Sequence, residues 1–168
     1  SAALVKATLI NAAVDMLDEN NDGANDNDYP IPNNHEGWGR LDLANATDGS
    51  ASYVDEGTGL ATNGVAAFAY SAPGGAPFKV TLVWSDAAST ETAAKNLVND
   101  LDLEVTDPSG ALYRGNIFAG GWSQAGGNAD RVNNVENVYL QNAAAGTWTV
   151  RVRGQNVPSG AQKFALVV

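Results

Sequence analysis

The first seventeen residues place apolar side chains at helical spacing. Those that recur three or four positions apart are Leu4, Ala7, Ile10, Val14 and Leu17. This spacing puts them on one face of a helix, and the Ser1 hydroxyl can cap the first turn. The pattern therefore predicts an amphipathic helix over residues 2–17.

A second, shorter helical pattern lies in "PNNHEGWGRLDLANA", residues 32–46. After a glycine-rich approach, the apolar positions that favour a helix are Trp38, Leu41, Leu43 and Ala44. The first fifty residues carry few large apolar groups, too few for a core of their own. We therefore expect residues 1–50 and residues 51–168 to belong to different domains.

From residue 51 onward the apolar period changes from helical to two. The segments that alternate in this way are 64–71, 76–85, 96–106, 133–142, 146–154 and 163–168, with shorter candidates at 51–56 and 111–114. Turns rich in glycine, proline and asparagine separate them, as in "APGGAP", "TDPSGA" and "NVPSGA". Short strands without helices between them predict an all-β fold, an antiparallel β-sandwich of about eight strands.

The alternation also predicts which side chains face the core. In residues 76–85 the inward set is Phe78, Val80, Leu82 and Trp84, and the outward set is Lys79, Thr81 and Val83. In residues 146–154 the pattern places Trp148, Val150 and Val152 inward and Arg151 and Arg153 outward.

Composition narrows the possible partners. The chain has 168 residues, 44% of them hydrophobic, and a formal net charge of −10. A nucleic-acid partner or an anionic membrane would need clustered Lys and Arg, so we expect neither. There is no cysteine, which excludes disulfides, thiolate metal sites and cysteine nucleophiles.

An acidic loop at residues 18–30, "DENNDGANDNDYP", resembles the first half of an EF-hand calcium loop. Its candidate ligands are Asp18, Asn20, Asp22, Asp26 and Asp28. Oxygen atoms at alternate positions can surround a hard cation, and Gly23 permits the sharp bend. Position twelve is Tyr29, however, where an EF-hand has a bidentate Glu. A solvated loop whose Asn and Asp favour turns stays open as the alternative.

A second acidic pattern lies on the predicted strand at 97–105. Its apolar face would hold Leu97, Leu101, Leu103 and Val105 together with Asn99, and its other face would hold Asp100, Asp102 and Glu104. An ordinary polar outer face explains the three acids. Paired acids also occur in glycosidases, but the sequence shows no active-site cleft.

The sequence gives little support to a catalytic triad or to a sugar-binding surface. His35 is the single histidine, and no serine motif accompanies it, so it fits a packing or hydrogen-bonding role better than a Ser-His-Asp triad. Exposed tryptophans could stack sugars, but Trp84 and Trp148 are expected in the core. Only Trp38 and Trp122 lie in or beside loops.

Two groups of segments resemble a known protein family. "SAALVKATLINAAVDM" and "PNNHEGWGRLDLANA" look like the end of a subtilase catalytic domain. "FKVTLVWSDA", "NLVNDLDLEVTDPSG", "YRGN", "NNVENV" and "GTWTVRVRGQNVPSGAQKFALVV" look like the C-terminal jelly-roll domain of bacterial alkaline subtilases. The resemblance implies a secreted serine endopeptidase as the parent. The family's catalytic motifs "HGT" and "GTSMA" are absent from this chain, so it should not hydrolyse peptides alone.

The resemblance also implies structural calcium. In the family's jelly-roll domains, ligands often lie in the loop between the "YRGN" and "NNVEN" strands. In this chain the corresponding ligands would be Asp130 with Asn116 and Asn133, approached by Asp100 and Asp102. Some family members place an acid directly after "GN", where this chain has Ile117, and part of the coordination shell is then missing.

The function expected from the resemblance is a non-catalytic domain that packs against its own catalytic domain and stabilises the protease. Calcium would contribute stability and no chemistry. The alternative is a substrate-binding module for collagen, another insoluble protein or a polysaccharide.

Overall fold

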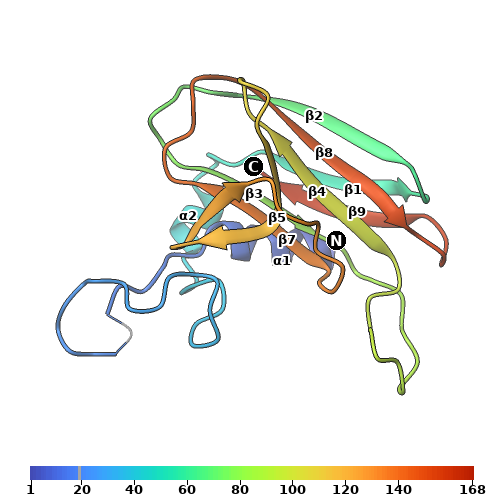
Figure 1. The fold of residues 1–168 in the computed structure, drawn as a ribbon, viewed down its shortest axis with the longest axis horizontal. Helices are drawn as coiled ribbons and strands as arrows, with labels where there is room; N and C mark the ends of the chain where they lie inside the picture. The colour runs from blue at the N-terminus through green and yellow to red at the C-terminus, as the bar shows by residue number, and fades with distance from the viewer. Residues whose placement is uncertain (19) are drawn as a thin grey trace.

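The computed structural model describes residues 1–18 and 20–168. Two antiparallel sheets face each other, with strand orders β1-β9-β3-β7 and β2-β8-β4-β5-β6 (Figure 1). The strands are β1 (Tyr53–Leu60), β2 (Val65–Ala72), β3 (Phe78–Val83), β4 (Asp100–Thr106), β5 (Leu112–Ala119), β6 (Trp122–Ala125), β7 (Val135–Leu140), β8 (Gly146–Asn156) and β9 (Gln162–Val167). The predicted all-β sandwich is confirmed.

The core between the sheets contains the side chains that alternation placed inward. Val80, Leu82, Leu103 and Val150 are fully buried there. Trp84 and Trp148 share this core, and a buried indole N–H needs an acceptor. The Nε1 of Trp84 donates to the carbonyl of Asn99 at 2.8 Å, and that of Trp148 to the carbonyl of Ala144 at 3.0 Å.

Helix α1 (Ala2–Asn11) packs on the outer face of the four-stranded sheet. Ala3 and Ala7 are buried against β3 and β9, where their small side chains allow close contact. At its end, Asn11 Nδ2 donates to Thr81 Oγ1 at 3.1 Å and to the carbonyl of Val167. Ser1 caps the first turn as predicted, its hydroxyl accepting from Leu4 N at 3.1 Å.

The first helix is shorter than predicted, because it ends at Asn11 and does not reach residue 17. Val14 instead pairs with Arg40 through two backbone hydrogen bonds of 2.9 and 2.8 Å. Gly39 makes this approach possible, since a Cβ there would lie 2.5 Å from the Val14 carbonyl oxygen. Apolar spacing cannot reveal such a long-range bridge.

The second helix, α2 (Leu43–Thr47), begins later than the pattern over 32–46 suggested. Asp42 is its N-cap, and the Asp42 side chain accepts from Asn45 N at 3.1 Å. Neither α1 nor α2 is long and apolar enough to cross a membrane, and the same holds for every helix in the described ranges.

One lateral side of the sandwich is closed by β5 and β6, which lie over the edge of β7. Two side chains supply the missing edge partners: Ser123 Oγ accepts from Tyr139 N at 2.9 Å, and Asn116 Oδ1 accepts from Asn137 N at 3.0 Å. The resemblance placed Trp122–Ala125 in the loop between the "YRGN" and "NNVEN" strands, whereas these four residues form β6 and pair with β5. At the opposite side, β1 and β2 are the edge strands of the two sheets.

Val105 and Val132 provide a matched test of the core. Val105 is fully buried, whereas Val132 is 69% exposed. We expect Val105→Ala to lower the free energy of unfolding by about 2 kcal/mol, since two methyl groups and their contacts are lost from a packed interior. Val132→Ala should change it by less than about 0.5 kcal/mol. Chemical denaturation of both variants measures the difference, and equal losses would contradict the assigned core.

Candidate functional site

Asp100 and Asp102 of β4 are the first predicted ligands that the structure brings together. Each is only 4% exposed, so these two acids of the polar strand face are shielded from solvent by neighbouring side chains. The Arg131 guanidinium spans them, with Nη1 3.3 Å from Asp100 Oδ1, Nη2 3.2 Å from Asp102 Oδ2 and a further contact from Nη1 to Asp102 Oδ1. Lys95 Nζ adds a weaker ion pair to Asp100 at 3.7 Å.

The electrostatics of this pair follow from burial and from Arg131. Burial raises the pKa of Asp100, and the nearby Arg131 charge opposes that shift. The hydrogen bond to Asp102 in turn raises the pKa of Arg131 above its ordinary value. A protein cation therefore already compensates the two carboxylates.

Asp130, Asn116 and Asn133 also lie together, as the sequence predicted. The amide nitrogens of Asn116 and Asn133 each donate to Asp130 Oδ2 at 2.7 Å. The backbone N–H groups of Val132 and Asn133 donate to Oδ1 at 2.8 and 3.1 Å. Burial alone would raise the pKa of Asp130, but these donors outweigh it and lower that pKa.

Glu136 is a buried acid that the sequence analysis missed. It is 1% exposed on β7, its Oε2 accepts from Leu103 N at 2.7 Å, and Oε1 has no hydrogen-bond partner among the described residues. Gly115 makes room for it, because a Cβ there would lie 2.2 Å from Oε2. Desolvation raises the pKa of Glu136 well above its ordinary value, and the charges of Asp102, Asp130 and Asp100 act in the same direction.

The alternation of apolar and polar residues along β7 contains a signal by which Glu136 could be identified. On β7, Glu136 shares the inward face with Val138 and Leu140, both core residues. A carboxyl at such a position needs a partner of its own. An acid in an otherwise apolar face therefore marks a candidate functional position better than an acid on an exposed face.

The four carboxylates of Asp100, Asp102, Asp130 and Glu136 offer the oxygen donors that calcium prefers. Their arrangement is incomplete for that purpose, since Arg131 takes the place between Asp100 and Asp102. Over residues 1–18 and 20–168, no three acidic or imidazole side chains are placed to hold a metal ion together. Calcium therefore stays a prediction, favoured here by the unpartnered Oε1 of Glu136.

The acidic loop forms a tight turn around its first predicted ligands. Asp18 accepts from Asp22 N at 2.9 Å and from Gly23 N at 3.2 Å, and Asn20 Oδ1 also accepts from Asp22 N. Gly23 has φ +88°, the sharp bend that the motif requires. The structure thus brings Asp18, Asn20 and Asp22 together. Asp26 and Asp28 follow in the exposed part of the loop, and Glu19 lies outside the described residues.

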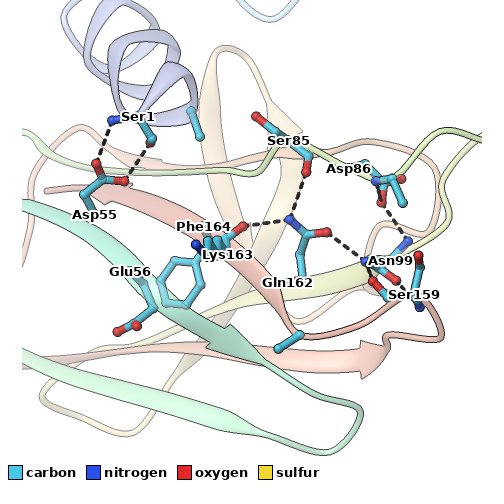
Figure 2. A pocket seen from close by; sticks show the side chains of 14 residues that line it. Ser1, Asp55, Glu56, Ser85, Asp86, Asn99, Ser159, Gln162, Lys163 and Phe164 are labelled. Carbon is cyan, nitrogen blue, oxygen red and sulfur yellow. Dashed lines mark hydrogen bonds and ion pairs between the residues drawn. The ribbon is translucent and has the colours of Figure 1, made fainter.

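A polar hollow with a volume of about 560 Å³ is lined by residues of α1, β1 and β9 and of the loops after β3, before β4 and before β9. Figure 2 shows Gln162 at its centre, joined to Asn99 and to Ser85. Asn99 Nδ2 donates to Gln162 Oε1 at 2.9 Å, and Gln162 Nε2 donates to the Ser85 carbonyl at 3.0 Å. These groups are engaged within the protein, so the hollow fits a clamp between loops better than a ligand site.

An apolar groove between α1 and α2 has a different character. It has a volume of about 400 Å³ and is lined by Leu4, Val5, Thr8, Leu9, Leu43, Ala46, Thr47 and Tyr53. Val5 is 61% exposed and Leu43 68% exposed. Contiguous exposed apolar side chains of this kind mark interaction surfaces.

Two of the remaining aromatic candidates, His35 and Trp38, are engaged in packing. The His35 ring stacks on Tyr29 with ring centroids 4.0 Å apart, consistent with the packing role expected for it. Trp38 contacts Phe118 and Tyr139 edge-on at 5.8 and 6.0 Å. This arrangement gives Trp38 a structural role and does not present it as a flat sugar platform.

Comparisons with known proteins find relatives whose names include serine protease. No family model matches the chain. It is 29% identical over its whole length to a Dictyostelium discoideum protein named serine protease/ABC transporter B family protein tagA, and 40% identical over 52% of its length to the related tagB. The chain spans only 10% and 5% of these relatives. Both are eukaryotic proteins, whereas the sequence resemblance pointed to bacterial subtilases.

Arg131→Gln tests the cation between the two buried aspartates. We expect a loss of about 1–3 kcal/mol in the free energy of unfolding at pH 7, because among the described residues Lys95 is then the one ion-pair partner left within 4 Å of the two buried carboxylates. The raised pKa of Asp100 means that protonation restores stability as pH falls toward the ordinary carboxyl value of about 4. The exposed Arg40→Gln is the control. If Arg131→Gln and Arg40→Gln lowered the free energy of unfolding equally and at every pH, the role assigned to Arg131 would be contradicted.

Glu136→Gln tests the buried acid in chelator-treated protein. A raised pKa in the folded state means that native stability increases as pH falls through that pKa and levels off below the unfolded value of about 4.3. The glutamine variant should be more stable than the native chain at pH 7 and lack most of this increase. Thermal melts from pH 4 to 8, with exposed Glu91→Gln as control, measure both effects. A native-like pH profile in Glu136→Gln would contradict the assignment.

Proposed function

We propose that this chain is an accessory β-sandwich domain of a serine protease, docked on the protease part through the groove between α1 and α2. The groove is the observation that carries the proposal. The domain contributes stability and positioning, while peptide hydrolysis takes place elsewhere in the same protein. The protease names of the relatives support this role, as does their much greater length.

The groove has the properties of a surface covered by a permanent partner. Its lining is apolar, and the large side chains of Val5 and Leu43 are mostly exposed in this chain. A helix normally buries its apolar stripe on one neighbour. Helix α1 buries Ala3 and Ala7 on the sandwich and directs Val5 and Leu9 toward the groove. An apolar surface of the protease part would cover the groove, so that both apolar faces of the helix would be buried.

Variants of the groove test the docking. We expect Val5→Asp and Leu43→Asp each to weaken binding to the protease segment of the same gene product by at least tenfold, since a carboxylate would be buried in an apolar interface. Calorimetric titration measures the affinity. Val132→Asp, an equally exposed position outside the groove, should bind as the native chain does.

Two results would refute the proposed function. Sequencing the gene beyond both ends of this chain could reveal no protease segment. Alternatively, the groove variants could bind that segment with native affinity. Retention of this chain on insoluble collagen or cellulose, without affinity for a protease segment, would favour the substrate-binding alternative.

A structural role for calcium is a second proposal, supported by two observations. The Asp18, Asn20 and Asp22 side chains gather around one turn in a loop that has no basic residue. The Oε1 of Glu136 is buried without a partner among the described residues, in the field of other acids. Bound calcium would supply the positive charge in either place, in the extracellular setting that the subtilase resemblance implies.

Thermal melts with calcium, magnesium and chelator test this second proposal. Calcium at a hundredfold excess over its dissociation constant would stabilise the fold by about 2.7 kcal/mol, which corresponds to a melting temperature about 5–10 °C higher for a chain of this size. Asp22→Ala should abolish the rise if the acidic loop binds the ion, and Asp130→Ala or Glu136→Gln if the β-domain does. Identical melts in all three solutions would refute calcium binding.

A further inference from the structure

Three of the four sheet edges carry features that prevent pairing with another strand. Strand β1 has a register irregularity between Glu56 and Leu60 and carries the acids Asp55 and Glu56. Strand β7 has its edge N–H groups bonded by Ser123 and Asn116 side chains. Strand β6 has only four residues. Exposed sheet edges are usually protected by charged side chains, by register irregularities, by a covering segment or by a short strand.

The fourth edge, β2, has none of these protections. It pairs in regular register with β8 over eight residues, Val65–Ala72, and it is the outermost strand of its sheet. No charged residue occurs anywhere from 57 to 78, in a chain with a net charge of −10. Its N–H and C=O groups on the side away from β8 form a template for another strand.

The side chains of β2 also favour an added strand. On its inner face, Phe68 and Tyr70 are only partly buried at the rim of the core. A neighbouring strand would cover this rim. On the outer face, Ala67 and Ala69 are exposed and small, so they would not obstruct close approach.

We propose that β2 is a docking edge for a second copy of this chain, paired antiparallel with the β2 of that copy. The two five-stranded sheets would then form one continuous sheet across a twofold axis. The inner rows, each with Phe68 and Tyr70, would meet and extend both cores. This pairing is independent of the proposed protease role.

Charge favours a second copy as the occupant. An edge without charge accepts an uncharged strand without burying an unpaired charge, and β2 is itself such a strand. The acidic loop lies on the side of the molecule away from β2 (Figure 1). A twofold pairing through β2 would therefore keep the acidic loops of the two copies far apart, where salt screens their repulsion.

Sedimentation over a range of protein concentrations tests the pairing. We expect a monomer–dimer equilibrium that strengthens with added salt. Ala69→Lys should raise the dimer dissociation constant at least tenfold, because it places a charge at the uncharged edge. Thr58→Lys adds the same charge at the exposed edge strand β1 and should leave dimerisation at the native level or stronger. A monomer at all concentrations, or an assembly of unlimited size, would overturn the proposal.

Cysteine cross-linking can detect the proposed β2–β2 pairing even when the dimer is weak. The native chain has no cysteine, so single substitutions at Ala67, Ala69 and Thr58 report on one position each. In an antiparallel self-pair, a residue near the twofold axis faces its own copy within the Cα separation of about 4.4–6.8 Å that a disulfide needs. Ala67→Cys or Ala69→Cys should form a covalent dimer under mild oxidation, and Thr58→Cys should not. Equal cross-linking at all three positions would overturn the assigned interface.

Discussion

The constraint on which this structure depends is the burial of one face of each sheet against the other. Trp84 and Trp148 both belong to that layer, and each donates its indole N–H to a backbone carbonyl within the protein. The carbonyl that accepts from Trp84 belongs to Asn99, so the core is joined to the loop before β4. Asn99 and Gln162 then join the loops through a network that includes Ser85 (Figure 2).

Glu136 departs from that constraint, since it places a carboxyl in the buried layer. The fold accommodates it through the absence of a side chain at Gly115 and through one hydrogen bond from Leu103 N. A carboxyl without a full set of partners costs free energy, and natural cores rarely keep such a group. Its position near Asp100 and Asp102 makes this end of the sandwich the most chemically distinctive part of the described structure.

Much of the fold could be predicted from the sequence, because period-two alternation encodes the strands directly. The inward positions from Phe78 to Trp84 and from Trp148 to Val152 are those that the pattern indicates. What alternation does not contain is long-range pairing. The Val14–Arg40 bridge ended the first helix early, and Arg131 reached Asp100 and Asp102 from a distant loop. Both contacts join residues more than twenty positions apart.

The two lateral sides of the sandwich differ for a physical reason. Where β5 and β6 fold over β7, side-chain oxygens of Asn116 and Ser123 complete an edge that has no neighbouring strand in its own sheet. The same Asn116 also holds Asp130 through its amide, so edge coverage and the acidic cluster depend on one residue. The β1–β2 side has no comparable cover, and only β1 carries charge. One side of the sandwich is covered, and the β2 edge at the other side carries no charge. The β2 edge is therefore the one at which an added strand would meet least obstruction.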